Sequence, residues 1–387
     1  MDFKNKIRIL YCLPYIITGG VEKRRLFLSR NLNPDEYELK IICIQARGKI
    51  ATDIEANGVE IISLGEIKGL FDFKQYRKLL NAVAEFRPHI IHGAVFEGVT
   101  MACVAGFLKN VPIVIAEETS DPQNRSKKAS LLLRVLTMVA DKVIAIAPAV
   151  GSYLEHIAKI PKYKIRVINN GVALPRIVSI AEIEDLKSTY GIKPGDIIIG
   201  SVGRLHNDHK RFTDLITAVA SVPDKDRVKI FIVGSGPDEQ LIKDAAERLG
   251  LKDQLYLPGY QSDMSSFYAL MDIFCLVSQR EGFGLVAAEA MLCSLPVIAT
   301  KVGGLKNVVI DMKTGFLVPP MQPLILAERI QLLIDDPDLR RTLGIAGYER
   351  AKVEYTEEIY CKKVESLYKE LLNQKKITSL KKITDVS

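Results

Sequence analysis

The chain has 387 residues, a formal net charge of +7, 48% hydrophobic residues and 26% charged residues. About two domains are expected at this length, and the composition is ordinary for a soluble globular protein. No apolar run approaches the roughly 20 residues of a membrane span, and six scattered cysteines without a CxxC pair indicate buried thiols in a reducing cytoplasm.

Short β-branched runs alternate with helical patterns along the whole chain. The first expected strands span residues 7–13, 39–44, 61–64, 90–92, 111–115, 143–146 and 165–168. A second set spans residues 197–202, 229–233, 255–257, 273–277, 296–299 and 315–318. This alternation predicts an α/β fold with parallel sheets covered by helices. Between the two sets, Gly171, Pro175, Gly191 and Pro194 cluster, which predicts two doubly wound domains.

The positive charge belongs to the first half of the chain. Residues 1–170 carry 25 Lys and Arg against 17 Asp and Glu, whereas residues 171–387 carry 28 against 29. The first half is therefore expected to face an anionic partner. Nucleic acid is disfavoured, since aromatic residues are not interleaved with the basic ones, and an anionic membrane or a lipid-phosphate acceptor fits better. The basic, apolar stretch 125–141 is typical either of a helix on a bilayer or of a helix packed in the core.

Two glycines and three polar side chains lie at strand ends in the first half. Gly19 and Gly20 follow the first strand and open a helix, where the backbone can approach a phosphate closely. His92 follows a second strand, and Glu117 and Glu118 follow a third. These three side chains can meet an acceptor hydroxyl, but a hydrogen-bonded structural role is an equal alternative for a lone histidine.

One segment of the second half has the chemistry of a diphosphate site, and another superficially suggests a dinucleotide fingerprint. Gly203 and Arg204 end a strand and Lys210 follows shortly, so two cations can neutralise a departing diphosphate. The run Gly234-Ser235-Gly236-Pro237 also follows a strand. It lacks the third glycine of a dinucleotide fingerprint, which disfavours a redox dinucleotide.

The segment from Glu281 to Glu289 carries the most information. A glycine-rich turn, Gly282-Phe283-Gly284, precedes a helix that begins near Leu285 and contains Glu289. Such a turn directs backbone N–H groups and a helix N-terminus at one place, which suits an anion or an oxygen-rich ligand. A capped surface helix with two solvated acids is the alternative for a bare glutamate pair. The following apolar run 295–300 favours a helix packed on a sheet.

No metal site is expected. Two Asp-x-Asp strings, 224–226 and 336–338, lie beside prolines and are interpreted as turn residues. The five histidines have no metal-ligand spacing.

Taken together, these segments resemble family 4 of the retaining glycosyltransferases, which have the GT-B architecture of two facing Rossmann-like domains. The resemblance covers nearly the whole chain in order. It rests on these segments: Gly19-Gly20-Val21-Glu22, Asn170-Gly171-Val172, Gly203-Arg204-Leu205 with Lys210, Gly234-Ser235-Gly236-Pro237, Glu281-Gly282-Phe283-Gly284 through Glu289-Ala290-Met291, and Gly303-Gly304 with Gly315.

The resemblance implies a role for each segment. Glu281 would meet the hydroxyls of the donor sugar, Glu289 would hold the ribose, and Arg204 and Lys210 would grip the diphosphate. Gly203, Gly234 and the backbone of Gly282, Phe283, Gly284 and Leu285 would approach the donor. Tyr260 and Gln261 would border the base, and Gly20 would close on the phosphates. The family needs no metal or other cofactor.

The chain departs from the family pattern at three places. Glu117-Glu118-Thr119 stand where members often carry His, Lys306-Asn307 replace a common Pro-Glu, and Ser294 replaces a usual Gly. The first departure concerns the acceptor side, and the others concern packing and sugar contacts.

We therefore expect a cytoplasmic enzyme, peripheral at an anionic membrane, that moves a hexose from a UDP-sugar to a saccharide or lipid-linked acceptor with retention. Glucose is the expected sugar because it is common in the family. The expected domains are 1–175 for the acceptor and 176–355 for the donor, with a terminal helix and basic tail, 356–387, returning to the first. A UDP-sugar epimerase or phosphorylase, or a catalytically silent nucleotide-sugar-binding module, are the alternatives.

Overall fold

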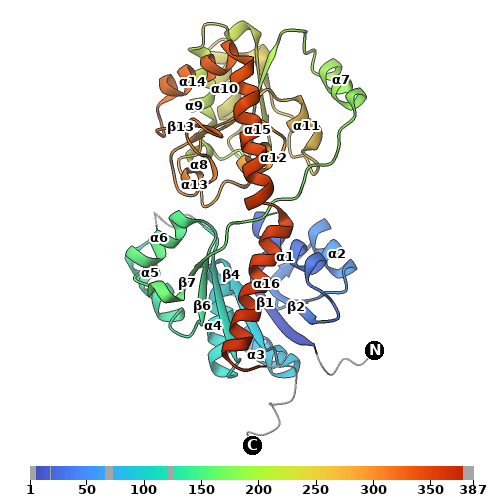
Figure 1. Ribbon diagram of the computed structural model, residues 1–387, viewed down its shortest axis with the longest axis vertical. Helices are drawn as coiled ribbons and strands as arrows, with labels where there is room; N and C mark the ends of the chain where they lie inside the picture. The colour runs from blue at the N-terminus through green and yellow to red at the C-terminus, as the bar shows by residue number, and fades with distance from the viewer. Residues whose placement is uncertain (1–5, 18, 66–72, 121–124, 378–387) are drawn as a thin grey trace, which may run out of the picture. The chain divides into compact units, whose positions relative to one another are not determined.

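The computed structural model describes residues 6–17, 19–65, 73–120 and 125–377 and divides into two compact units (Figure 1). Unit 1 comprises residues 1–171 and 357–387, and unit 2 comprises residues 172–356. The chain leaves unit 1 a few residues before the expected boundary at 175. Thr18 and most of the expected basic tail lie outside the described residues.

Unit 1 is a parallel seven-stranded sheet with the order β3-β2-β1-β4-β5-β6-β7. The strands are β1 (Ile7–Ile16), β2 (Tyr37–Ala46), β3 (Glu60–Ser63), β4 (Ile90–Ala94), β5 (Ile113–Glu118), β6 (Lys142–Ala145) and β7 (Ile165–Val167). The helices are α1 (Gly20–Asn31), α2 (Lys49–Ala56), α3 (Phe73–Phe86), α4 (Val95–Leu108), α5 (Lys127–Leu136), α6 (Pro148–His156) and α16 (Glu357–Gln374), with a short 3₁₀ turn, η2 (Lys162–Lys164).

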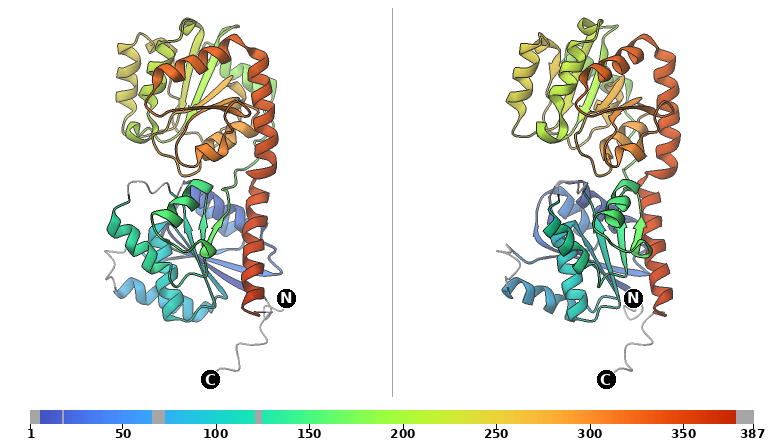
Figure 2. Two further views of the ribbon diagram at one scale, coloured as in Figure 1. Left: turned by 60° about the vertical axis from the view of Figure 1, so that its left-hand side comes forward. Right: turned by 90° about the vertical axis from the view of Figure 1, so that its left-hand side faces the viewer.

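Side-chain alternation along the strands divides the interior of unit 1 between the two faces of the sheet. Ile9, Tyr11 and Leu13 of β1 pack in one hydrophobic cluster with α1, α2 and α16. Figure 2 shows α16 alongside this sheet, and buried Val364 and Leu371 are part of the same cluster. The terminal helix is therefore an integral layer of unit 1.

Unit 2 is a parallel six-stranded sheet with the order β10-β9-β8-β11-β12-β13. The strands are β8 (Ile197–Val202), β9 (Val228–Val233), β10 (Leu255–Tyr256), β11 (Ile273–Leu276), β12 (Val297–Thr300) and β13 (Gly315–Val318). The helices are α7 (Ile180–Thr189), α8 (Asn207–Lys210), α9 (Phe212–Ala220), α10 (Glu239–Arg248), α11 (Ser265–Leu270), α12 (Leu285–Leu292), α13 (Leu305–Val308), α14 (Pro323–Asp335) and α15 (Pro337–Glu354), with 3₁₀ turns η3 (Lys225–Arg227) and η4 (Lys252–Gln254).

Each of the expected strands is present, and the two parallel α/β units confirm the predicted GT-B fold class. The main difference is at β1, which continues beyond Pro14 to Ile16. Proline lacks an N–H for the ladder, and the pairing of β1 with β2 omits Pro14 and resumes at Tyr15. The sheet thus tolerates the proline as a local interruption.

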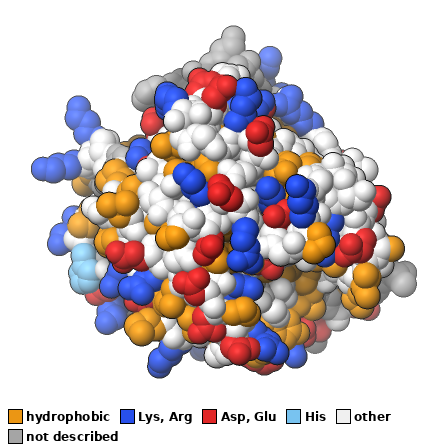
Figure 3. Space-filling model, turned by 90° about the horizontal axis from the view of Figure 1, so that it is seen from above, with side chains coloured by type: hydrophobic (Ala, Val, Ile, Leu, Met, Phe, Trp, Pro, Cys, Tyr) orange, Lys and Arg blue, Asp and Glu red, His pale blue; other side chains and the backbone are white. Residues whose placement is uncertain are grey.

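The surface carries both signs of charge, and the cysteines are free thiols. Seen from above (Figure 3), Lys and Arg side chains are interspersed with Asp and Glu over most of the face. All six cysteines are free thiols, and burial raises the pKa of Cys103 to about 12. None of the described helices has both the length and the apolar character required to cross a bilayer.

Candidate donor site at the carboxyl edge of unit 2

The strand order of unit 2 places its candidate site. In open α/β sheets, ligands bind outside the carboxyl ends of the strands, where the strand order reverses direction. In unit 2 this reversal lies between β8 and β11, which are neighbours in the sheet. Gly203 and Arg204 follow β8 directly, and Ser278 to Glu281 follow β11. The residues that sequence analysis selected therefore meet at one edge.

An ion pair between Lys210 and Glu281 joins the two strand ends. The Lys210 Nζ lies 2.7 Å from Glu281 Oε2, and the two side chains are 20% and 19% exposed. Ser278 Oγ is 3.4 Å from the same carboxylate oxygen. Arg204 is exposed, and within the described part of the chain its guanidinium makes no hydrogen bond or ion pair. This edge thus holds one paired and one unpaired cation that a polyanion can reach.

Two neighbours of this pair were missed by sequence analysis. Arg280 Nη2 lies 2.7 Å from His209 Nε2, and the backbone N–H of Gln279 donates to the His209 carbonyl. Burial and the nearby Arg280 lower the pKa of His209, so its Nε2 is a neutral acceptor for the guanidinium. Each is adjacent in sequence to a selected residue, but no sequence pattern places His209 against Arg280.

The turn before α12 has the geometry of a glycine-dependent site. Gly284 is the N-cap of α12 with φ 96°, a left-handed conformation that disfavours other residues. The neighbouring loop also packs closely, since a Cβ on Gly304 would lie 2.3 Å from the Gly282 carbonyl oxygen. The Gly304 N–H donates to the Glu281 carbonyl at 2.9 Å. The paired glycines 303–304 thus hold the turn at the N-terminus of α12.

Glu289 is oriented by a tyrosine from a different helix. The buried Tyr268 hydroxyl, on α11, donates to Glu289 Oε2 at 2.8 Å. Burial and the adjacent Glu289 carboxylate raise the pKa of Tyr268, which keeps the hydroxyl protonated as a donor. Tyr268 is a further residue that the sequence did not indicate.

Replacing Tyr268 by Phe tests this orientation. The change removes one hydrogen bond to a carboxylate and leaves the aromatic packing. With Glu289 on the ribose, the role that the family resemblance implies, KM for the nucleotide-sugar is expected to rise about fivefold to tenfold with little change in kcat. Steady-state kinetics of donor consumption measure both constants. Unchanged KM would show that Glu289 does not need this partner.

The remaining donor-side residues lie in neighbouring loops. Gly234 has φ 148°, and a Cβ there would lie 1.9 Å from the Gly203 carbonyl oxygen, so the loops after β8 and β9 contact each other. The Gly234 N–H donates to the Gly259 carbonyl, which anchors the loop carrying Tyr260 and Gln261. Tyr260 is 58% exposed, and the Gln261 side chain donates to the Pro258 carbonyl.

In unit 1 the strand order reverses between β1 and β4, which are followed by Gly19-Gly20 and by Val95. Gly20 is the first residue of α1, as expected. Val95 opens α4 with φ 63°, an outlier for a β-branched residue that sequence analysis did not anticipate. At the end of β5, Glu118 forms an ion pair with Arg125 and accepts a hydrogen bond from Ser120 Oγ.

His92 and Glu117 lie in the interior of unit 1, which corrects the expectation that they meet an acceptor. Their side chains are 0% and 1% exposed. Glu117 pairs with Arg25 at 3.1 Å and accepts from the Tyr11 hydroxyl at 2.6 Å. His92 Nδ1 lies 2.8 Å from the Tyr368 hydroxyl of α16. Neighbouring strand residues point to opposite faces, so Glu117 joins the core beneath α1 and α16. Glu118 is 6% exposed and lies outside that core, where it pairs with Arg125.

The Arg25–Glu117 pair predicts an acid-sensitive unit 1. Burial opposes ionisation of Glu117, but Arg25 and His92 outweigh it and lower its pKa from 4.5 to about 2. The ionised pair therefore stabilises unit 1 fully above about pH 4.5, and this contribution is lost as the pH falls toward 2. Urea unfolding midpoints measured between pH 6 and pH 2.5 are expected to drop over this window. A Glu117→Gln variant is expected to show a smaller drop, and an equal drop would remove Glu117 as the cause.

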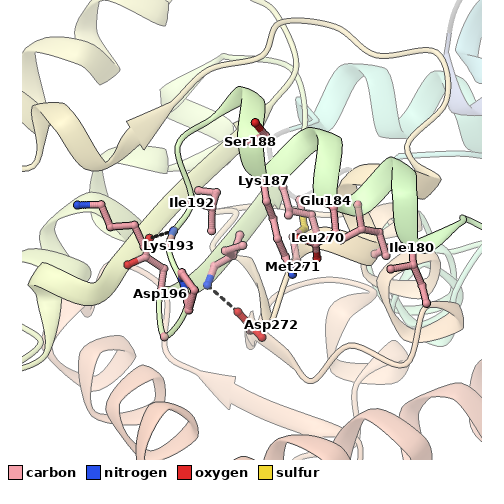
Figure 4. A pocket seen from close by; sticks show the side chains of 15 residues that line it. Ile180, Glu184, Lys187, Ser188, Ile192, Lys193, Asp196, Leu270, Met271 and Asp272 are labelled. Atoms are coloured by element: carbon pink, nitrogen blue, oxygen red, sulfur yellow. Dashed lines mark hydrogen bonds and ion pairs between the residues drawn. The ribbon is translucent and has the colours of Figure 1, made fainter.

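A cavity of about 800 Å³ lies away from this edge. It lies between α7, α11 and the start of β8, with Ile180, Lys187, Met271 and Asp272 among its lining residues (Figure 4). Asp272 precedes β11 and accepts the Ile198 N–H, so the cavity lies at the amino ends of the strands. That is the opposite end of the sheet from Arg204 and Glu281.

The string 224–226 lies at the 3₁₀ turn η3, as predicted, whereas Asp336 and Asp338 lie at the start of α15. Asp336 is the N-cap of α15 and accepts the Leu339 N–H, and Asp224 accepts from Gln331. Among the described residues, no group of three or more His, Cys, Asp or Glu side chains is arranged to hold a metal ion.

Comparison with known families accounts for both units. Residues 182–350 match the model of glycosyl transferases group 1, and residues 18–176 match that of Glycosyltransferase Family 4. The chain belongs to glycosyltransferase family 4. The first match contains Arg204, Lys210, Glu281 and Glu289, so the carboxyl edge of unit 2 lies within the segment that characterises the family.

The relatives of this family 4 member are named for different activities. The chain is 27% identical over 347 residues to the capsular polysaccharide biosynthesis glycosyltransferase CapM of Staphylococcus aureus, a match to 86% of this chain and 90% of CapM. It is 27% identical over 245 residues to N-acetyl-alpha-D-glucosaminyl L-malate synthase of Bacillus anthracis, which covers 63% of this chain and 64% of that protein. A crystal structure of Anabaena HepE with UDP-glucose superposes with a TM-score of 0.83 at 22% identity, over 94% of this chain and 99% of HepE.

Proposed function

We propose that this glycosyltransferase moves a hexose, with glucose as the first candidate, from a UDP-sugar to a saccharide or lipid-linked acceptor in polysaccharide or glycolipid synthesis. The observation that carries the proposal is the meeting of Arg204, Lys210 and Glu281 at the carboxyl edge of unit 2. The similarity to CapM and the UDP-glucose complex of the structurally similar HepE support this choice of donor and acceptor class.

The proposed chemistry is stabilisation of the leaving group. As the bond between the anomeric carbon and the phosphate oxygen breaks, negative charge grows on the diphosphate. Arg204 and Lys210 would neutralise it, with the N-terminus of α12 directed at the same place. On donor binding, Lys210 would turn from Glu281 to the phosphate, and Glu281 would accept hydrogen bonds from the sugar hydroxyls. Glu289, held by Tyr268, would accept from the ribose.

The acceptor hydroxyl would attack the anomeric carbon from the face that the diphosphate leaves, so the configuration is retained. Its oxygen forms the new bond to carbon, and its proton passes to the departing phosphate oxygen. In this scheme Glu281 is not a covalent nucleophile, unlike the second carboxylate of a retaining glycosidase. On the acceptor side, Glu118 is the proposed contact.

Two experiments test the proposal. Incubation with UDP-glucose and mass spectrometry of the intact protein should show UDP release without a sugar adduct, and a sugar found on Glu281 would refute the scheme. Transfer is also proposed to need no divalent cation, because the two cations at this edge serve the diphosphate. Activity that persists in EDTA would agree with this, and loss that only Mg²⁺ or Mn²⁺ restores would contradict it.

Acceptor dependence separates this function from the alternatives. An epimerase or phosphorylase would convert the UDP-sugar with no saccharide acceptor, giving an epimerised or phosphorolysed product. A silent binding module would bind UDP without turnover.

A further inference from the structure

The outer face of α5 in unit 1 exposes apolar side chains. Leu131 is 60% exposed, Val135 is 51% exposed, and Met138, just beyond the helix, is 71% exposed. These residues are spaced three and four apart, so they form one stripe along the helix surface. Packing within unit 1 does not account for these exposed apolar side chains, because they do not contribute to its core.

The opposite side of α5 is fixed to unit 1. Leu133 is 2% exposed, and Ser130 Oγ lies 2.8 Å from the Tyr153 hydroxyl of α6. The Ser126 side chain caps the helix by accepting the Ala129 N–H. The stripe is thus held outward by buried contacts on the other side of α5.

A tyrosine extends this apolar face. Lys164 Nζ donates to the carbonyls of Thr137, Met138 and Ala140, and so holds the η2 turn against the end of α5. Tyr163, in this turn, is 71% exposed. An exposed aromatic ring with a polar tip beside a basic, apolar helix is typical of a bilayer interface.

The segment that contains the apolar stripe is rich in cations. From residue 126 to residue 164 the chain has seven Lys and Arg and only two acids, Asp141 and Glu155. Lys127, Lys128 and Arg134 are exposed and form no ion pair with any described residue. Asp141 is already engaged by the Val114 N–H and by Lys375.

Some exposed lysines on other helices have an acidic partner on the same helix. Lys243 bonds Glu239 on α10, and Lys362 bonds Glu358 on α16, each one turn apart. The three exposed cations of α5 have no such partner among the described residues, and they lie on a helix that also exposes an apolar stripe.

We propose that this α5 face, defined by Lys127, Lys128, Leu131, Arg134, Val135, Met138 and Tyr163, docks unit 1 onto an anionic lipid bilayer. The apolar side chains would enter the boundary between head groups and acyl chains, and the cations would meet lipid phosphates. The helix would lie in the plane of the interface without crossing it.

The position of α5 also relates docking to the acceptor. Arg125 immediately precedes α5 and pairs with Glu118 at the carboxyl end of β5. A docked α5 would place this edge of unit 1 beside the lipid head groups, which suits a lipid-linked acceptor. This last step rests on the proposed function, whereas docking itself does not.

Vesicle flotation of the full chain tests docking. The protein is expected to float with phosphatidylglycerol–phosphatidylcholine vesicles, not with phosphatidylcholine alone, and to be released by salt because the lipid attraction is partly ionic. In the K127E/K128E/R134E variant, partition is expected to fall about a hundredfold, since each cation near the surface contributes about fivefold. In the L131Q/V135Q/M138Q variant it is expected to fall at least about tenfold.

Matched control variants change similar side chains on other helices. K243E/K362E alters cations, and I345Q/V353Q alters Ile345 and Val353, which are 53% and 63% exposed on α15. Both should float as the parent does, and circular dichroism should show all variants folded. Absence of flotation with anionic vesicles, or equal losses in the controls, would overturn the proposal. So would binding to soluble heparin without binding to vesicles, which would assign the face to a soluble polyanion.

Hydrolysis of a UDP-sugar in lipid-free buffer separates the two proposals. It should be unaffected in both α5 variants if donor chemistry resides at the carboxyl edge of unit 2. Failure of hydrolysis in the parent protein would concern the proposed function and leave the flotation result to decide on docking.

Discussion

Replacing Lys210 by Ala is expected to lower kcat for sugar transfer by about two to three orders of magnitude. The Lys210 ammonium, 2.7 Å from Glu281, is one of the two cations proposed for the leaving diphosphate. Loss of a preorganised group that meets charge developing in the transition state costs about this much. Binding of UDP should weaken less, because Arg204 and the N-terminus of α12 remain.

Initial rates with a UDP-sugar, together with UDP affinity from calorimetry, measure these two effects. Lys243→Ala is the matched control, since it removes a lysine of the same unit whose exposed pair with Glu239 lies on a surface helix. The control should keep full activity. A Lys210→Ala variant with an unchanged kcat would exclude this residue from leaving-group stabilisation.

Replacing Glu117 by Ala is expected to destabilise unit 1 by about 3–5 kcal/mol. The substitution leaves the guanidinium of Arg25, which is 0% exposed, without its carboxylate partner. Removing one member of a buried ion pair costs this much because an uncompensated charge stays in the interior. The Tyr360 hydroxyl, 2.9 Å from Arg25, cannot replace a negative charge.

Urea unfolding followed by far-ultraviolet circular dichroism, with hydrogen exchange of α1 to assign the transition to unit 1, measures this loss. Glu239→Ala, on the exposed pair with Lys243, should cost under about 1 kcal/mol. A double variant, Arg25→Met with Glu117→Leu, should recover much of the stability, because a buried pair can be replaced by apolar groups of similar size. A double variant less stable than Glu117→Ala would contradict this explanation.

The strands could be predicted from the sequence because parallel strands buried on both faces are continuous β-branched runs. β8, Ile197–Val202, and β11, Ile273–Leu276, are such runs, and each is followed by a selected residue. Since parallel strands place their carboxyl ends at one edge, Arg204 and Glu281 could be assigned to the same site before any contact was known. The turn at Gly284 was predictable for a different reason. Its φ of 96° is a conformation that favours glycine, so the residue type itself indicates the turn.

Other features depend on contacts between distant segments. Glu117 and His92 were assigned to the strand ends, but their partners Arg25, Tyr360 and Tyr368 come from α1 and α16, far along the chain. Sequence spacing cannot indicate such a buried network. The outward rotation of α5 is set by the contact between Ser130 and Tyr153, so the exposure of its apolar stripe was also beyond sequence reasoning.

The central claim is retaining transfer of a hexose from a UDP-sugar at the carboxyl edge of unit 2, and proton NMR of donor hydrolysis tests it most directly. The protein would be incubated with UDP-glucose, other UDP-sugars and GDP-mannose, with Glu281→Ala as the control. We expect UDP-glucose to be cleaved to UDP and glucose that appears first as the α-anomer, and the Glu281→Ala control to be nearly inactive. First appearance of the β-anomer, or cleavage of GDP-mannose in preference to every UDP-sugar, would contradict it.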